Sequence, residues 1–242
     1  MRLFPNRWAR EAQANTVPKP SCRCLDSQYE ESAWTELQIH TEEQDTECAG
    51  WQRLNELIEL AASDGREEFS PGREMTPTEW AQITVLPKCI SKLKHVKHLN
   101  LYGSSLVRIP PEIGELTMLE QFTPYTSYRL HWLPYEITRC RLLKRSTIST
   151  RALYGNYNYR APFPKLPQSY PGAPDRCSVC QSAFGDTPPL QYWISLGIAT
   201  DIVPLLVHAC CEQCISKLPQ PSEDYVQFPH QGGLNLEQPK SE

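Results

Sequence analysis

The clearest helical pattern in the chain lies between residues 51 and 61. Apolar side chains recur there every three or four residues, which places them on one face of a helix. The pattern stops before Gly65, a residue type that often ends a helix in a left-handed conformation. The sequence therefore predicts a helix whose apolar stripe must pack against another element. The stripe consists of Trp51, Leu54, Leu57, Ile58 and Ala61.

A second apolar pattern follows this helix and occurs three times. Its copies begin at Leu86, Ile109 and Leu133, so their starts lie 23 and 24 residues apart. A single copy of this length cannot bury its own apolar face, so we expect stacked copies to share one continuous core. The apolar positions that coincide are Ile90, Ile113 and Ile137; Leu93, Leu116 and Cys140; and Val96, Leu119 and Leu143.

These copies resemble the leucine-rich repeat family, which has the pattern L-P-x-x-I-x-x-L-x-x-L-x-x-L-x-L. The resemblance covers about residues 83–155, under a third of the chain. It implies an α/β fold in the form of a short leucine-rich repeat solenoid, with one short parallel strand per repeat. Because the array is short, we expect it to need an N-terminal helical cap.

The copies depart from the family pattern at the position where an asparagine usually satisfies backbone groups of the turn. The chain has Ser104, Ser127 and Arg151 at that position. A serine hydroxyl can do part of this work, whereas an arginine cannot do it in the same way. Pro124 also removes a hydrogen-bond donor from the second predicted strand. We therefore expect an imperfect array.

In an array of this type, the strand residues that flank the buried leucines face the concave surface. Two tyrosines, adaptable polar groups and an arginine on that surface suit recognition of another protein. The alternative is an ordinary solvated sheet face, because three strands form only a small platform. The candidate binding residues are His98, Asn100, Tyr102, Gln121, Thr123, Tyr125, Arg145, Thr147 and Ser149.

Two C-x-x-C pairs near the C-terminus indicate a metal site. Cys177 and Cys180 form one pair, and Cys211 and Cys214 form the other. Four thiolates are what a closed tetrahedral Zn²⁺ site requires, so we predict one structural zinc ion. A hairpin between the pairs and a short helix after the second would resemble a treble-clef zinc finger. Cys210 or His208 remains an alternative for one of the four ligands.

Two other kinds of cysteine chemistry compete with this interpretation. A thioredoxin-type redox pair requires a βαβ context, which the sequence lacks, and it leaves the second pair unexplained. A cysteine nucleophile is the main alternative, because Cys210 beside Cys211 gives one thiol more than four ligands need. Leucine-rich repeats also occur in bacterial effector ubiquitin ligases that use a cysteine. A cysteine-dependent transferase using Cys210 or Cys211 is therefore the second functional hypothesis.

Charge and composition narrow the choice of partners and compartment. The net charge of −4 and the absence of Lys and Arg between Cys177 and Cys214 argue against binding to nucleic acid. Asp201 and Pro204 interrupt the most apolar window, which argues against a membrane span. The N-terminus has no signal-like apolar core, so we expect a cytoplasmic protein.

These patterns together predict a non-enzymatic adaptor or scaffold that binds another protein through its repeats and contains a structural zinc site. The expected organisation is a polar, acidic and partly disordered segment (1–50), a helical N-terminal cap (51–82), leucine-rich repeats (83–160), a Pro-rich linker (161–175), a four-cysteine zinc module (176–220) and a flexible tail (221–242).

Overall fold

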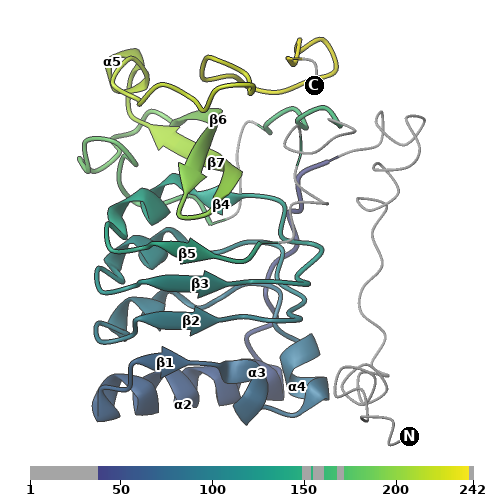
Figure 1. Ribbon diagram of the computed structural model, residues 1–242, viewed down its shortest axis with the longest axis vertical. Coiled ribbons are helices and arrows are strands. Elements are labelled where there is room, and N and C mark those ends of the chain that lie inside the picture. The colour runs from purple at the N-terminus through teal and green to yellow at the C-terminus, as the bar shows by residue number, and fades with distance from the viewer. Residues whose placement is uncertain (1–37, 149–153, 155–160, 168–171, 240–242) are drawn as a thin grey trace, which may run out of the picture.

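The computed structural model of the chain describes residues 38–148, 154, 161–167 and 172–239 (Figure 1). It contains a helical N-terminal end, a parallel sheet built from stacked short strands, and a smaller sheet above it. This mixture of helices with a parallel and a mixed sheet confirms the predicted α/β class.

The predicted first helix is present as α2, Ala49–Asp64. Gly65 follows it in the left-handed conformation with φ 66°, as expected for a glycine that ends a helix. The helix buries four of the five residues of the predicted stripe, and Trp51 is partly buried. Two short helices follow: α3, Pro71–Glu74, and α4, Pro77–Ala81. A capping box between Thr76 and Glu79 fixes the start of α4.

The parallel sheet has the strand order β1-β2-β3-β5. Its strands are β1, Glu68–Phe69; β2, His98–Asn100; β3, Gln121–Thr123; and β5, Arg145–Ser146. His98 pairs with Gln121, and Gln121 pairs with Arg145. Equivalent residues of the three sequence copies therefore lie side by side. Pro124 directly follows β3 and is not part of it.

A short 3-10 helix precedes each of the strands β2, β3 and β5. These helices are η3, Lys88–Lys92; η4, Pro111–Glu115; and η5, Tyr135–Arg139. Each follows the proline of the repeated pattern, because a proline fixes φ and needs no N–H partner at that point. The core shared by helices and strands contains all the coincident apolar residues except Leu143, which packs against it.

Two serines lie in the turns after β2 and β3. The Oγ atoms of Ser104 and Ser127 are 2.6 Å apart, and both side chains are buried. Ser127 Oγ donates to the carbonyl of Leu101, and Ser104 Oγ accepts from the N–H of Leu106. The two hydroxyls thus satisfy backbone groups in neighbouring turns.

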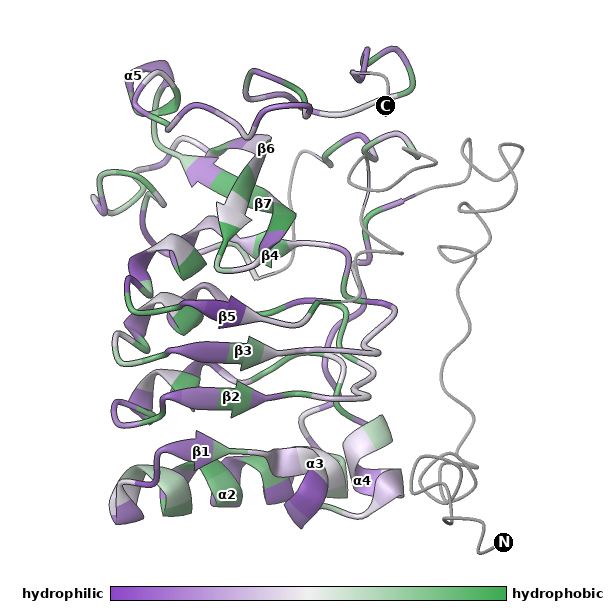
Figure 2. Ribbon diagram, in the orientation of Figure 1, coloured by the Kyte–Doolittle hydropathy of each residue, from purple (hydrophilic) through white to green (hydrophobic). Residues whose placement is uncertain are grey.

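A hairpin covers the open end of the parallel sheet. Its strands are β6, Leu190–Ile198, and β7, Asp201–Ala209, and β7 pairs with the short strand β4, Leu133–Pro134. At the hairpin turn, Thr200 Oγ1 donates to the Ser146 carbonyl and accepts from the Ser146 N–H. The edge strand β5 is thereby bonded on its outer side. Figure 2 shows that β7 is largely hydrophobic, whereas β2 and β3 of the parallel sheet are more hydrophilic.

An extended segment, residues 38–47, runs alongside the stacked turns and is called the strap below (Figure 1). At one end of the strap, Tyr154 donates to the carbonyl of Gln38. In its middle, Glu42 pairs with Arg129, and the Glu42 carbonyl accepts from Arg108. At the other end, Gln44 Oε1 accepts from the N–H of Thr84. The strap therefore contacts several levels of the array.

A second apolar cluster lies between the strap and the hairpin, and it contains Ile39, Trp132, Tyr154, Phe163, Trp193 and Leu206. Phe163 belongs to the segment expected as a linker, of which residues 161–167 are described and the first four are buried. His230, in the segment expected to be a tail, exchanges two backbone hydrogen bonds with Trp193. Both segments therefore pack on the hairpin. None of the helices among the described residues is long and apolar enough to cross a membrane.

Candidate metal centre

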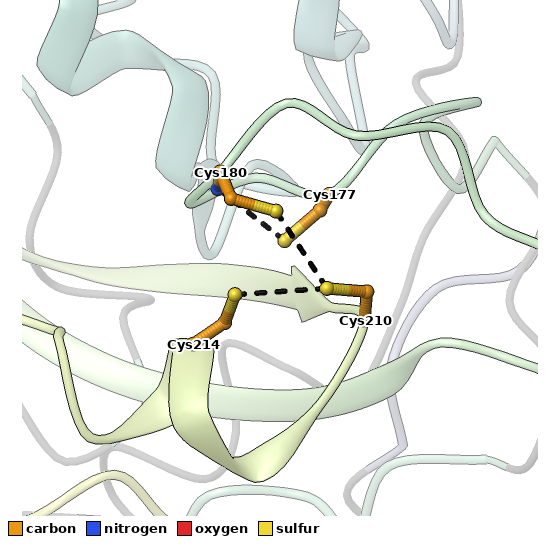
Figure 3. A group of neighbouring side chains, drawn as sticks. All are labelled: Cys177, Cys180, Cys210 and Cys214. Carbon is orange, nitrogen blue, oxygen red and sulfur yellow. Dashed lines mark hydrogen bonds between the residues drawn. The ribbon is translucent and has the colours of Figure 1, made fainter.

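Four cysteines from two parts of the chain meet at the end of the hairpin (Figure 3). Cys177 and Cys180 lie in the loop before β6, and Cys210 directly follows β7. Cys214 lies in the short helix α5, Glu212–Ile215. The predicted hairpin and the predicted helix after it are therefore both present. They bring the two ends of a stretch of about forty residues together.

The loop of the first pair turns tightly after Cys180. Gln181 has a φ of 63°, in the left-handed region that favours glycine. Its N–H donates to the carbonyl of Cys177, and the N–H of Cys177 donates to the carbonyl of Ser182. These bonds hold the two cysteines on one side of the turn.

The distances between the sulfur atoms match a tetrahedral metal site. All four Sγ atoms lie within 4.8 Å of one another, and Cys210 Sγ is 3.6 Å from the Sγ atoms of Cys180 and Cys214. Zinc–sulfur bonds of ~2.3 Å in a tetrahedron place neighbouring sulfurs ~3.8 Å apart. The four residues are free cysteines. Their arrangement therefore suits one thiolate-bound metal ion.

The cluster contains three of the four ligands that the sequence predicted, with Cys210 in place of Cys211. Cys211 Sγ lies 3.7 Å from Cys210 Sγ, and its residue is the N-cap of α5. Cys210 lies in the link between β7 and this N-cap, with its Sγ 3.6 Å from Cys214 Sγ. His208, the other alternative, is outside this group, and its backbone exchanges hydrogen bonds with Ser178.

The electrostatic environment differs among the thiols. Hydrogen bonds from the side chain and backbone of Ser182 lower the pKa of Cys180 to about 6. The backbone of Cys214 lowers the pKa of Cys211. Burial raises the pKa of Cys214. The Cys214 thiol lowers the pKa of Cys210, but its other neighbours and burial together raise it to about 11. Such a mixed set of thiols binds a cation best when all four have lost their protons.

The thiol cluster is joined to the last repeat copy by packing and hydrogen bonds. Cys177 and Cys214 are buried in the same core as Ile137 and Cys140. Arg139 of η5 donates to the carbonyl of Ser178 at 3.1 Å. Glu136 lies beside this contact with only 2% of its surface exposed, and burial raises the pKa of its carboxyl group. The cysteine module thus sits directly on the array.

The predicted binding residues occupy one face of the parallel sheet, called the polar strand face below. His98 Nε2 and Thr123 Oγ1 are 3.1 Å apart across β2 and β3. Tyr102 and Tyr125 follow these strands, are exposed, and have ring centroids 6.1 Å apart. Asn100 and Gln121 are half-buried, Arg145 and Thr147 are exposed, and Ser149 lies outside the described residues.

Two structural contacts were not predicted from the sequence. Thr200 and Asp201 bond to Ser146, although the hairpin turn carries no motif that points to β5. The strap lies in the segment 1–50, which was expected to be polar, acidic and partly disordered. In the strap, Glu42 pairs with the buried Arg129. No feature of the sequence separates Glu42 from its neighbour Glu43.

No protein-family model matches the chain, and no curated protein matches it either.

Proposed function

We propose that the protein is a non-enzymatic adaptor or scaffold that binds another protein through the polar strand face. In this proposal the array is a short leucine-rich repeat solenoid with α2 as its N-terminal cap. The observation that carries the proposal is the in-register row of unlike polar residues, His98, Gln121 and Arg145, beside two touching exposed tyrosines. Tyrosine and arginine are among the residue types that contribute most of the binding energy at protein interfaces.

The family assignment is supported by the geometry of the repeated copies. Strand residues that are 23 or 24 positions apart pair in parallel, and a 3-10 helix returns behind each strand. Ser104 and Ser127 occupy the asparagine position and bond to backbone groups of the turns. This is the role that the family pattern gives to asparagine.

The metal in this proposal is a structural zinc ion bound by Cys177, Cys180, Cys210 and Cys214. The sulfur distances and the hairpin followed by a helix support a treble-clef-like site. All-thiolate ligand sets favour zinc over the hard cations calcium and magnesium. A structural zinc ion contributes an apparent ~10–16 kcal/mol to folding at neutral pH. Zinc would therefore hold the hairpin and α5 together on top of the array.

The cysteine cluster supports the two competing functions, a cysteine-dependent transferase and nucleic-acid binding, less well. Cys210 as a metal ligand is not a free nucleophile, so a transferase would have to use Cys211. The module contains no Lys or Arg between its first and last cysteine, which leaves no cations there for phosphate contacts.

The experiment that tests the adaptor proposal compares two double variants of the full chain in quantitative affinity enrichment. Tyr102→Ala with Tyr125→Ala removes the aromatic part of the polar strand face. Met118→Ala with Leu142→Ala removes two similarly exposed large side chains from the loops that precede the strands. We expect the recovery of specific partners to fall tenfold or more only in the tyrosine variant. A residue at the centre of an interface often contributes ~2 kcal/mol to the binding free energy.

An equal set of partners in wild type and the tyrosine variant would contradict the proposal. Arg145→Ala provides a second test of the same face, because its side chain is exposed in an adjacent strand. Circular dichroism of each variant shows whether a lost partner reflects a lost contact or a lost fold.

A further inference from the structure

The four thiols of the cluster differ in their access to solvent. Cys177 and Cys214 are buried, with 0% and 4% of their surface exposed, and belong to the main core. Cys180 and Cys210 are exposed, and so is Cys211 beside them. A small reagent dissolved in water therefore reaches one side of the proposed metal site without any opening of the fold.

The sulfur of Cys210 is at the centre of this exposed side. It lies 3.6 Å from Cys180 Sγ and Cys214 Sγ, and 3.7 Å from Cys211 Sγ. Metal-bound cysteines are thiolates, and exposed thiolates are the form of cysteine that peroxides oxidise. An oxidised Cys210 would have a second thiol within reach for a disulfide.

We propose that Cys180 and Cys210 form an oxidation site for hydroperoxides, at which the two cysteines join in a disulfide and the bound metal is released. This inference rests on the proposed zinc site.

The reaction proceeds in two steps. The Cys210 thiolate attacks the peroxide, the O–O bond breaks, and a sulfenic acid forms while the leaving oxygen takes a proton and departs as water or an alcohol. Cys180 then attacks the sulfenic sulfur, an S–S bond forms, and the hydroxide departs as water after gaining a second proton. Two sulfurs lose two electrons in total, and the peroxide accepts both. The metal is left with two ligands, Cys177 and Cys214.

The geometry favours Cys180 over the other two neighbours of Cys210. Adjacent residues such as Cys210 and Cys211 have Cα atoms ~3.8 Å apart across a trans peptide, shorter than the ~4.4–6.8 Å found in disulfides. Cys214 is buried on the core side of the cluster. Cys180 comes from a separate loop and is exposed, so it can move towards Cys210 without disturbing the core.

The test uses the full chain loaded with zinc. Zinc content is first measured by elemental analysis, hydrogen peroxide is then added, released zinc is followed with a chromogenic chelator, and disulfides are mapped by mass spectrometry without reduction. We expect about one zinc ion to be released per chain, together with a peptide pair joined through Cys180 and Cys210. Reduction with dithiothreitol in the presence of zinc should restore the metal content.

Two variants sharpen this test without removing a ligand. Cys211→Ser should release zinc as the wild type does, because the proposed disulfide does not include that residue. Cys89→Ser, in η3, serves as a control for a thiol elsewhere in the chain. Retention of zinc under peroxide, or a disulfide that excludes Cys180 or Cys210, would overturn this inference alone. A chain that binds no zinc before oxidation would overturn the metal site as well.

Discussion

The difference between Cys210 and Cys211 depends on where a strand ends and a helix begins. Strand β7 ends at Ala209, and Cys211 is the N-cap of α5. Cys210 is thus left in the link between them with its sulfur near Cys214. The C-x-x-C spacing pointed to Cys211, because spacing alone does not reveal which of two adjacent side chains faces the loop of the first pair.

We therefore expect Cys210→Ser to lose the bound metal and Cys211→Ser to retain it. Four thiolates complete the site, and removing one of them lowers zinc affinity by several orders of magnitude. Elemental analysis of the two purified variants, measured beside wild type, provides the comparison. Metal loss in Cys211→Ser with full metal content in Cys210→Ser would show that Cys211, and not Cys210, is the fourth ligand.

Glu136 provides a second prediction at the residue scale, concerning pH. Burial raises the pKa of this carboxyl group in the folded protein, with Arg139, Glu112 and Ser178 as its neighbours. The folded state therefore keeps the proton to higher pH than the unfolded state. The ionisation of Glu136 therefore leaves the free energy of unfolding unchanged below the pKa that this carboxyl group has in the unfolded chain. The free energy of unfolding falls as the pH rises from there through the pKa of the carboxyl group in the folded protein.

Glu136→Gln removes this charge while keeping the shape of the side chain. We expect the variant to be more stable than wild type by on the order of 1 kcal/mol at pH 8, and the difference to vanish near pH 4. Urea unfolding across this pH range measures it. The matched control is Glu47→Gln, an exposed residue near the start of α2. A constant difference at all pH values would rule out the ionisation of Glu136 as its cause.

At the scale of elements, the hairpin turn forms hydrogen bonds with β5, the edge strand of the parallel sheet. Thr200 makes two hydrogen bonds to the backbone of Ser146, at 2.7 and 3.2 Å. Thr200→Val keeps the shape and removes both bonds. We expect a loss of about 1–3 kcal/mol and faster amide hydrogen exchange in β5, with little change in β2. Thr117→Val, at an exposed position, is the control.

The elements with a regular pattern were predictable from the sequence, and those that depend on distant contacts were not. The helix at residues 51–61 and the strands at residues 98–100 and 121–123 follow from local periodicity, because their apolar residues recur at fixed spacing. The strap and the packing of Phe163 depend on partners far away in the sequence. Their own residues carry no period, so no local rule could place them. The same limit applies to the choice between two adjacent cysteines.

At the scale of the whole molecule, the four-cysteine cluster and the array share one core. Cys177 and Cys214 belong to the same apolar cluster as the leucines of the three sequence copies and of α2. We expect removal of zinc with a strong chelator to lower the thermal midpoint of the whole chain in one transition. Calorimetry with and without the chelator measures this. Two separate transitions, of which only one moves, would show that the cysteine module unfolds independently.

The strap also bears on the order in which the chain can fold. In a simple repeat protein every contact is between neighbours, so folding can follow synthesis from one end to the other. Here Ile39, near the start of the described chain, shares its apolar cluster with Leu206 of β7. The ribosome makes Ile39 early and its partner late, and contacts between such distant residues form slowly. The end of the strap around Ile39 can therefore complete its packing only after β7 has left the ribosome, although the contacts of Glu42 and Gln44 with the array can form before then.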